Sequence, residues 1–190
     1  ESLGYKVFSG EENDVLDRYF QAAKTFKANA IIRITGDCPL IDSFLVDEVI
    51  EGFIDSNVDY ASNREPPTYP DGLDVEVISI KAREDAHKKA KEDFQREHVT
   101  PYITGKRPDL GAGEFRTGQV KFEVGFSHIR WTLDTVEDLN RIRKLVSYLP
   151  EDYRWLQALS VATQEPELLG ISSLTILHMI CTCVELGLQI

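Results

Sequence analysis

Residues 33–42 read RITGDCPLID, with a glycine and an acid shortly after apolar residues. It continues a run of small and branched apolar residues, 28–34, that has helical patterns on both sides. A short β-branched run between helices is typical of an interior strand of a parallel sheet. Gly36 allows a close backbone approach or an unusual φ angle, and Pro39 prevents the strand from simply continuing. We therefore predict a buried strand that is followed at once by an acidic residue, Asp37.

Helix and strand patterns alternate along the rest of the chain. Apolar residues at helical spacing predict helices after residues 11–13, over 45–53, after Asp134 and over 152–163. Asp42 or Ser43 is suited to cap the second of these helices, and Thr135 with Asp138 has capping-box spacing. Strands are predicted over 28–35, 58–61, 73–80, 119–124 and 128–133. This alternation indicates a layered α/β domain with a largely parallel sheet.

Composition limits the classes of function. The 190 residues are 42% hydrophobic and 28% charged, as in ordinary globular proteins, and the net charge of −11 argues against general binding to nucleic acid or anionic membranes. Residues 171–190 carry one charge, but their polar residues argue against membrane insertion. The mixed charges of residues 81–97 favour a solvated helix face over an interaction patch. Three cysteines form no disulfide or metal-ligand framework, which indicates a reducing, cytoplasmic setting.

Two acids stand where predicted strands end. Asp37 could offer its carboxylate to a hard cation held by phosphates, although spacing alone slightly favours a turn cap. Asp134 ends the predicted strand HIRWTLD just before a helix, where an N-cap is the alternative. Two such carboxylates could share Mg²⁺ if their strands are neighbours, which periodicity cannot show. Cys38 follows Asp37, whose charge should raise the thiol pKa and make it a poor nucleophile.

Two further segments could contact a substrate. The loop YPDGLDVE carries Asp71, Asp74 and Glu76, which could bind sugar hydroxyls or add to a metal site. An equal alternative is that these acids have no binding role and simply form an acidic turn that enters an edge strand. Arg96 and His98 could bring cations toward an anionic substrate, although a lone histidine on a charged helix is more often simply exposed.

Five segments in order resemble one family: SGEENDVLDRYFQAA, RITGDCPLID, YPDGLDVEV, REHVTPYI and HIRWTLDTVEDL. They are similar to the spore coat polysaccharide biosynthesis protein F family, cytidylyltransferases related to CMP-sialic acid and CMP-Kdo synthetases. The resemblance runs from about Val7 to Leu149. It implies a glycosyltransferase-A-like nucleotide-diphosphosugar transferase fold, a three-layer α/β/α sandwich. It also implies transfer of a cytidylyl group from CTP to a sugar or sugar acid, with release of pyrophosphate, in surface polysaccharide synthesis.

The resemblance also implies roles for particular residues. Asp37 and Asp134 match catalytic acids that bind Mg²⁺. Arg18, Gly36 and Asp37 match nucleotide-binding positions. The acceptor-side segments carry Asp71, Asp74, Glu76, Arg96 and His98. The implied partners are CTP, a sugar substrate and a second copy of the chain in a homodimer, with no nucleic acid.

The chain departs from the family pattern at its beginning. The family opens with a strand and a loop rich in Gly and Arg or Lys, and this chain starts after that element. We therefore expect a nucleotidyltransferase domain over 1–165 that is truncated at its N-terminus, and a tail over 166–190. Two alternatives stay open. One is a non-catalytic remnant that acts in dimerisation or sugar binding, and the other is a metal-dependent glycosyltransferase.

Overall fold

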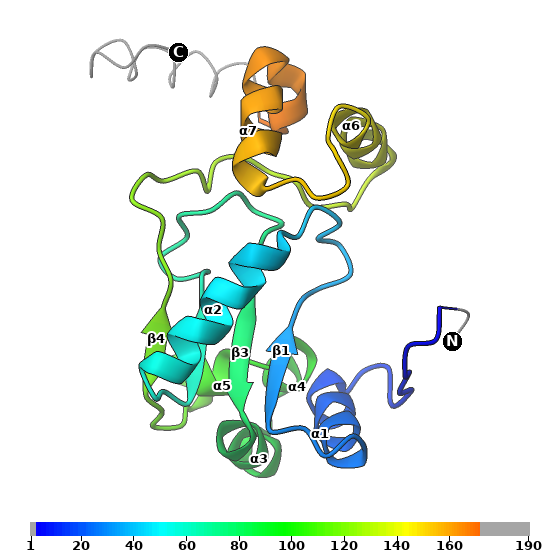
Figure 1. The fold of residues 1–190 in the computed structure, drawn as a ribbon. Coiled ribbons are helices and arrows are strands. Elements are labelled where there is room, and N and C mark those ends of the chain that lie inside the picture. The colour runs from blue at the N-terminus through cyan, green and yellow to red at the C-terminus, as the bar shows by residue number, and fades with distance from the viewer. Residues whose placement is uncertain (1–2, 172–190) are drawn as a thin grey trace. The chain divides into compact units, whose positions relative to one another are not determined.

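The computed structural model describes residues 3–171, which fall into two compact units (Figure 1). Unit 1 contains residues up to 33, residues 48–62 and residues 76–120, and unit 2 contains residues 34–47, 63–75 and those from 121 onward. No helix within residues 3–171 is long and apolar enough to cross a membrane. Our interpretation of residues 172–190, including the argument against membrane insertion, lies outside the described residues.

Unit 1 is built on a four-stranded mixed sheet. Its strands are β1 (Ala30–Arg33), β2 (Tyr60–Ser62), β3 (Glu76–Ser79) and β4 (Thr117–Gln119), in the order β1-β3-β2-β4. β3 pairs antiparallel with both β1 and β2, while β2 and β4 are parallel. The prediction of a largely parallel sheet is therefore wrong for β3, which runs opposite to the other three strands.

The physical reason for this correction is the connection that enters β3. The helix α2 (Ser43–Asp55) joins β1 to β2, and a helical crossover lets two strands run in the same direction. No helix separates β2 from β3, because residues 63–75 form an irregular loop. β3 can then return in the opposite direction between the two strands that precede it in sequence.

Besides the greater part of α2, unit 1 contains five short helices: α1 (Val15–Thr25), α3 (Ile80–Lys89), α4 (Asp93–His98), α5 (Pro101–Thr104) and the 3₁₀ helix η1 (Pro108–Leu110). The acidic start of α1 was predicted, and the Asp14 carboxylate accepts a hydrogen bond from the Asp17 N–H at 2.9 Å. The charged segment 81–97 is not one helix, because the chain leaves helical geometry after Lys89 and re-enters it at Asp93. Residues from the helices and the sheet form one core, which includes Leu16, Ile78, Ala82 and Tyr102.

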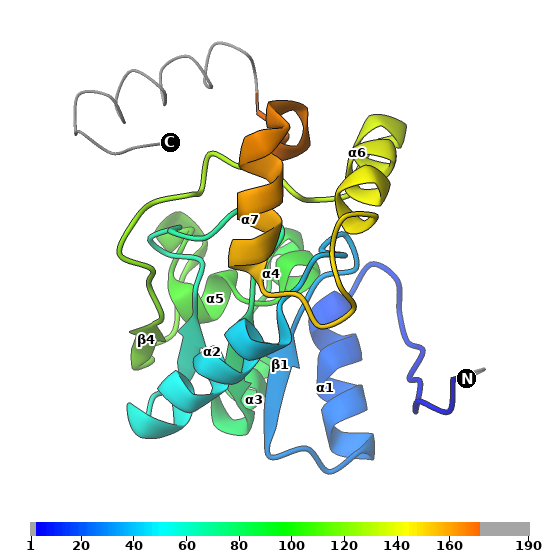
Figure 2. The same cartoon turned by 45° about the horizontal axis from the view of Figure 1, so that its top comes forward.

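Unit 2 contains the helices α6 (Val136–Val146) and α7 (Trp155–Gln164), both labelled in Figure 2, and the 3₁₀ helix η2 (Pro166–Leu169). The predicted capping box is confirmed, since Thr135 and Asp138 satisfy each other's backbone N–H groups at the start of α6. Leu168 and Leu169 are buried, and the Trp131 indole N–H donates to the Leu168 carbonyl at 3.2 Å. Residues just beyond 165 therefore belong to the packed unit.

Two predicted strands are corrected by the structure. Of the segment 119–124, only Gln119 lies in a strand, at the end of β4. The segment 128–133 forms no strand and makes a single isolated bridge, between Arg130 and Asp71. A β-branched pattern indicates that a segment can pair, but pairing along its length requires a partner of matching register.

Candidate active site

Asp37 lies in a turn that follows β1, as predicted. The turn is closed by the Cys38 N–H, which donates to the Thr35 carbonyl at 3.2 Å. Gly36 does not have a positive φ angle, and an added Cβ there would meet no atom within 4 Å. Two reasons for glycine at position 36 were predicted, an unusual φ angle and a close approach of other backbone. Neither is found among the described residues. The open space leaves this backbone accessible to a ligand.

Cys38 is a buried free thiol beside this turn. Burial raises its pKa most, and the charge of Asp37 raises it further, while a hydrogen bond with Thr35 acts in the opposite direction. The direction agrees with the predicted rise of the thiol pKa. The larger cause is desolvation and not, as we predicted, the neighbouring acid.

One extended segment brings the acidic turns of unit 2 together. The Leu133 N–H donates to the Asp37 carbonyl at 2.8 Å, and the Trp131 N–H donates to the Asp71 carbonyl at 2.7 Å. The Asp71 N–H in turn donates to the Ile129 carbonyl at 2.9 Å. Asp134 directly follows this segment. The backbone near Asp37, Asp71 and Asp134 is thus tied to a single stretch of chain, although that stretch is not the sheet strand we predicted.

Gly72 makes this close approach possible. Its φ angle is +103°, and an added Cβ would lie 2.8 Å from the backbone carbonyl carbon of Trp131. Both facts require glycine, since side-chain-bearing residues avoid this φ and real Cβ atoms do not approach backbone so closely. The Pro-Asp-Gly pattern predicted a turn here, but only the packed segment explains why its third residue is glycine.

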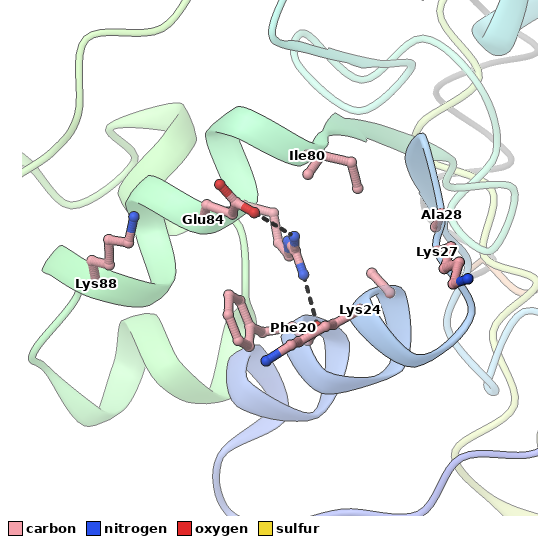
Figure 3. Close-up of a pocket in the computed structure, with 9 residues that line it drawn as sticks. Phe20, Lys24, Lys27, Ala28, Ile80, Glu84 and Lys88 are labelled. Atoms are coloured by element: carbon pink, nitrogen blue, oxygen red, sulfur yellow. Dashed lines mark hydrogen bonds and ion pairs between the residues drawn. The ribbon is translucent and has the colours of Figure 1, made fainter.

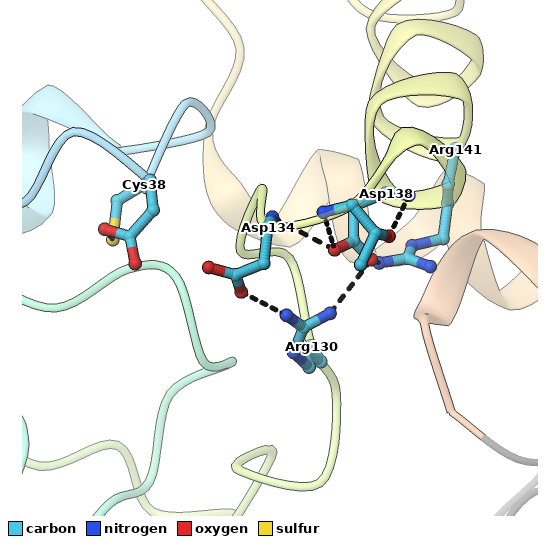
Figure 4. A network of polar contacts seen from close by, with 7 residues as sticks. Cys38, Arg130, Asp134, Asp138 and Arg141 are labelled. Carbon is cyan, nitrogen blue, oxygen red and sulfur yellow. Dashed lines mark hydrogen bonds and ion pairs between the residues drawn. The ribbon is translucent and has the colours of Figure 1, made fainter.

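Asp134 takes part in a network of charged side chains (Figure 4). Arg130 forms ion pairs with the Asp134 carboxylate and, at 2.9 Å, with the Asp138 carboxylate. The Asp134 side chain is 54% exposed, whereas that of Asp138 is 4% exposed. Thr135 is the N-cap of α6, so the alternative of an Asp134 N-cap is wrong. An exposed carboxylate held by one arginine remains accessible to a ligand.

Asp138 is the buried centre of the network, and we had predicted only its capping role. One carboxylate oxygen accepts from the N–H groups of Asp134 and Thr135, at 3.0 and 2.9 Å. The other accepts from Arg130 and Arg141. Burial acts to raise the pKa of Asp138, but these hydrogen bonds outweigh it and hold the pKa well below its usual range. The capping-box spacing of Thr135 and Asp138 predicts the contacts of Asp138 with backbone N–H groups. No local pattern predicts its ion pairs with Arg130 and Arg141.

The depressed pKa of Asp138 predicts a pH dependence of stability. A carboxyl group with a lowered folded pKa stabilises the fold above its unfolded pKa of about 3.9, and this contribution is lost as pH falls toward the folded pKa. Asp138→Asn should therefore lower the free energy of unfolding at pH 7, with a deficit that shrinks between about pH 5 and pH 2. Urea unfolding of both proteins across this range measures the difference. A deficit that is constant with pH would contradict the assignment.

The remaining predicted acids differ in their surroundings. Asp71 is exposed in its turn, and Asp74 forms an ion pair with Arg64 at 2.8 Å, both within unit 2. Glu76 lies in β3 of unit 1 and is 1% exposed. Its carboxylate forms an ion pair with Arg33 and accepts from the Tyr60 hydroxyl at 2.7 Å. These contacts explain Glu76 as a structural acid of the sheet, so its predicted role toward substrate has no support from its surroundings.

The predicted cationic residues lie in unit 1. Arg96 is held by the Asp14 carboxylate, with its Nε at 3.0 Å, and by the His87 carbonyl at 3.0 Å. His98 is exposed and packs edge-on against the Phe94 ring at a centroid distance of 4.5 Å. Arg18 is half-buried in α1. The structure therefore ties the backbone of Asp37 and Asp71 to the segment that precedes Asp134, and it places Arg18, Arg96 and His98 in the other unit.

The donor set of unit 2 fits one kind of metal site. Within residues 3–171 no group of three or more His, Cys, Asp or Glu side chains could hold a metal ion. Mg²⁺ does not require such a cage, because it binds one or two carboxylates and completes its shell with water and substrate phosphates. Asp37 and Asp134 are the two carboxylates that would hold Mg²⁺ of this kind if it arrived with a nucleotide.

The chain resembles known proteins over most of its length. The cytidylyltransferase family model matches residues 2–165. An uncharacterized protein of Methanocaldococcus jannaschii is 37% identical over 90% of this chain and 69% of its own length. The spore coat polysaccharide biosynthesis protein SpsF of Bacillus subtilis is 35% identical over 75% and 57%, so the chain spans less than two thirds of that relative.

A solved structure gives the same picture for the fold. The structure of a cytidylyltransferase from Leptospira borgpetersenii matches with a TM-score of 0.81 and 29% identity, over 88% of this chain and 70% of that one. The predicted α/β cytidylyltransferase-like fold is thereby confirmed, with its mixed sheet and flanking helices.

Proposed function

Because this chain belongs to the cytidylyltransferase family, a family of nucleotidyltransferases, we propose that it transfers a cytidylyl group from CTP to a sugar or sugar acid and releases pyrophosphate. The observation that carries the proposal is the hydrogen bond of 2.8 Å between the Leu133 N–H and the Asp37 carbonyl. It ties the turn of Asp37 to the segment that ends at Asp134. A site with a half-buried Asp37 and an exposed Asp134 suits a triphosphate that brings its own cation.

The reaction requires little covalent work from the protein. A sugar hydroxyl attacks the α-phosphorus of CTP in line with the departing pyrophosphate, so positioning and charge neutralisation dominate. Mg²⁺, when bound, supplies neutralisation of the negative charge that develops on the phosphate oxygens. Asp37 and Asp134 would hold the ion.

Arg130 and Asp138 have a positioning role in this proposal. Arg130 pairs with the exposed Asp134 carboxylate and is itself fixed by the buried Asp138. A side chain held in this way loses little conformational freedom when a ligand binds, which favours a single productive geometry. Asp71 is suited to an acceptor hydroxyl, because its backbone is tied to the same segment at Trp131.

The pathway and the cellular compartment of the reaction are proposed from fewer observations. The name of the Bacillus subtilis relative supports a role in surface polysaccharide synthesis. Cys38 is a free thiol, which is consistent with a reducing cytoplasmic compartment. The homodimer stays a prediction, and sedimentation velocity at micromolar concentration tests it.

The proposed function is tested by pyrophosphate release from CTP. With Mg²⁺ and a panel of sugars and sugar acids, we expect at least one acceptor to give pyrophosphate and a CMP-sugar in equal amounts. EDTA should abolish the reaction, and ATP, GTP and UTP should react more slowly. Nucleotide-sugar donors tested with the same acceptors separate this activity from glycosyl transfer. Turnover of a nucleotide sugar with none of CTP would overturn the proposal.

A further inference from the structure

A pocket of about 390 Å³ lies within unit 1 beside α1 and α3 (Figure 3). One part of its lining is apolar, from Phe20, Ala23, Ala28 and Ile80. Its volume is in the range of small-molecule sites. The pocket shares no residue with the candidate active site, which belongs to unit 2.

A buried arginine with unused hydrogen-bonding capacity lines this pocket. Arg83 is 3% exposed, and it donates to the Phe20 carbonyl at 2.7 Å and to the exposed Glu84 carboxylate at 3.3 Å. Its Nε–H is buried and has no hydrogen-bond partner among the described residues. Burial lowers the pKa of Arg83 more than Glu84 raises it, so its charge is only partly compensated. Buried polar groups are nearly always satisfied, and an orphaned guanidinium N–H favours an added acceptor.

Three lysines add positive charge to the same pocket. Lys24 and Lys27 lie on the α1 side and Lys88 lies on α3 (Figure 3). All three are exposed, and none has an ion pair within the part of the chain that the structure describes. Together with Arg83 they outnumber the single acid Glu84, in a chain whose net charge is −11. A concave cationic site on an acidic protein attracts anions selectively to that place.

The backbone conformation of Lys27 is also unusual. Lys27 has a φ angle of 52° immediately after α1, a left-handed conformation that glycine adopts with less strain. The chain therefore places a lysine, with its charge, at a position where the backbone favours glycine.

From these observations we propose that the pocket binds a small organic phosphate, with its phosphoryl group at Arg83 and its body against Ala23 and Ile80, while the three lysines around the pocket attract the anion without all contacting it. A planar guanidinium matches the geometry of phosphate oxygens, and lysines add charge without directional demands. The apolar wall distinguishes the proposed ligand from a bare inorganic anion. This site is separate from nucleotide binding at Asp37 and does not depend on the proposed function.

Phenyl phosphate is a suitable probe, because it combines a phosphoryl group with an apolar ring. Titration into ¹⁵N-labelled protein in EDTA, which removes metal-dependent phosphate binding, should give saturable amide shifts at Ala23, Ala28 and Ile80. Inorganic phosphate should bind more weakly, and phenol should not bind. The triple variant Lys24→Gln, Lys27→Gln, Lys88→Gln should bind phenyl phosphate roughly tenfold more weakly.

The matched control removes three exposed lysines elsewhere: Lys81→Gln, Lys91→Gln and Lys121→Gln. It changes the net charge equally and should retain binding within about twofold. Arg83→Lys keeps the charge but loses the planar fork and should also weaken binding. If the Arg83→Lys variant fails to fold, the binding measured for the triple lysine variant tests the proposal on its own. Absence of saturable shifts, an equal loss in the control, or equal binding of inorganic phosphate would overturn the proposal.

Discussion

Asp37→Asn is expected to lower the rate of pyrophosphate release from CTP by about a thousandfold, which is the usual cost of removing one electrostatic contact to the reacting group. An amide keeps the size of the carboxylate but removes the negative charge that would attract Mg²⁺. The turn itself should survive, because its closing hydrogen bond from the Cys38 N–H is made to the Thr35 carbonyl. Stability should therefore change by less than about 1 kcal/mol.

Calorimetric titration separates the cause of this loss. Mg²⁺ should strengthen CTP binding to the wild type and should have little effect on the Asp37→Asn variant. Asp47→Asn is the matched control, because Asp47 is an exposed acid in the same unit, on α2. It should behave as the wild type in both assays. Unchanged Mg²⁺ and CTP titrations in the Asp37 variant would refute its assignment as a metal ligand.

Gly72→Ala is expected to destabilise the protein by about 3 kcal/mol. The added Cβ would lie 2.8 Å from the Trp131 carbonyl carbon and 3.0 Å from the Thr132 nitrogen, and a φ of +103° disfavours any side chain. Relief of the overlap requires the turn of Asp71 to move away from Trp131. The hydrogen bond of 2.7 Å that joins these two residues would then lengthen or break.

Equilibrium unfolding in urea measures this loss. Gly125→Ala is the control in the same unit, because an added Cβ there meets nothing within 4 Å and its φ angle is not positive. It should leave the free energy of unfolding within about 0.5 kcal/mol of the wild type. A Gly72→Ala protein as stable as that control would show that the turn does not pack on residues 131–132.

Local patterns predicted most of the helices and their caps. Asp42 accepts from the N–H groups of Phe44 and Leu45 at 2.8 and 3.3 Å, as its position before α2 indicated. The same carboxylate accepts from the Trp155 N–H at 2.8 Å, which ties the start of α2 to α7. Capping involves residues a few positions apart, so sequence spacing can reveal it. The contact with α7 depends on packing and has no counterpart in the local pattern.

Pairing between distant segments was beyond the reach of these patterns. The segment 128–133 has the composition of a strand, yet its backbone hydrogen bonds go to scattered partners, Asp37, Asp71, Phe126 and Leu169, and not to one neighbouring strand. No local pattern predicts a role for Arg130, which is one cation within that segment. For Asp138 the sequence predicts only a helix cap. The structure makes them partners, because both side chains converge beside Asp134.

Local sequence patterns were enough for the α/β class, for the caps of α2 and α6, and for the acids that follow β1 and precede α6, because each depends on residues close together in the chain. Only the tertiary structure decided the reversed direction of β3, the burial of Glu76 against Arg33, and the joining of the Asp37 turn to Leu133. These features depend on hydrogen bonds and charges between segments far apart in sequence. Their energies are realised only when the whole chain packs, so no local pattern records them.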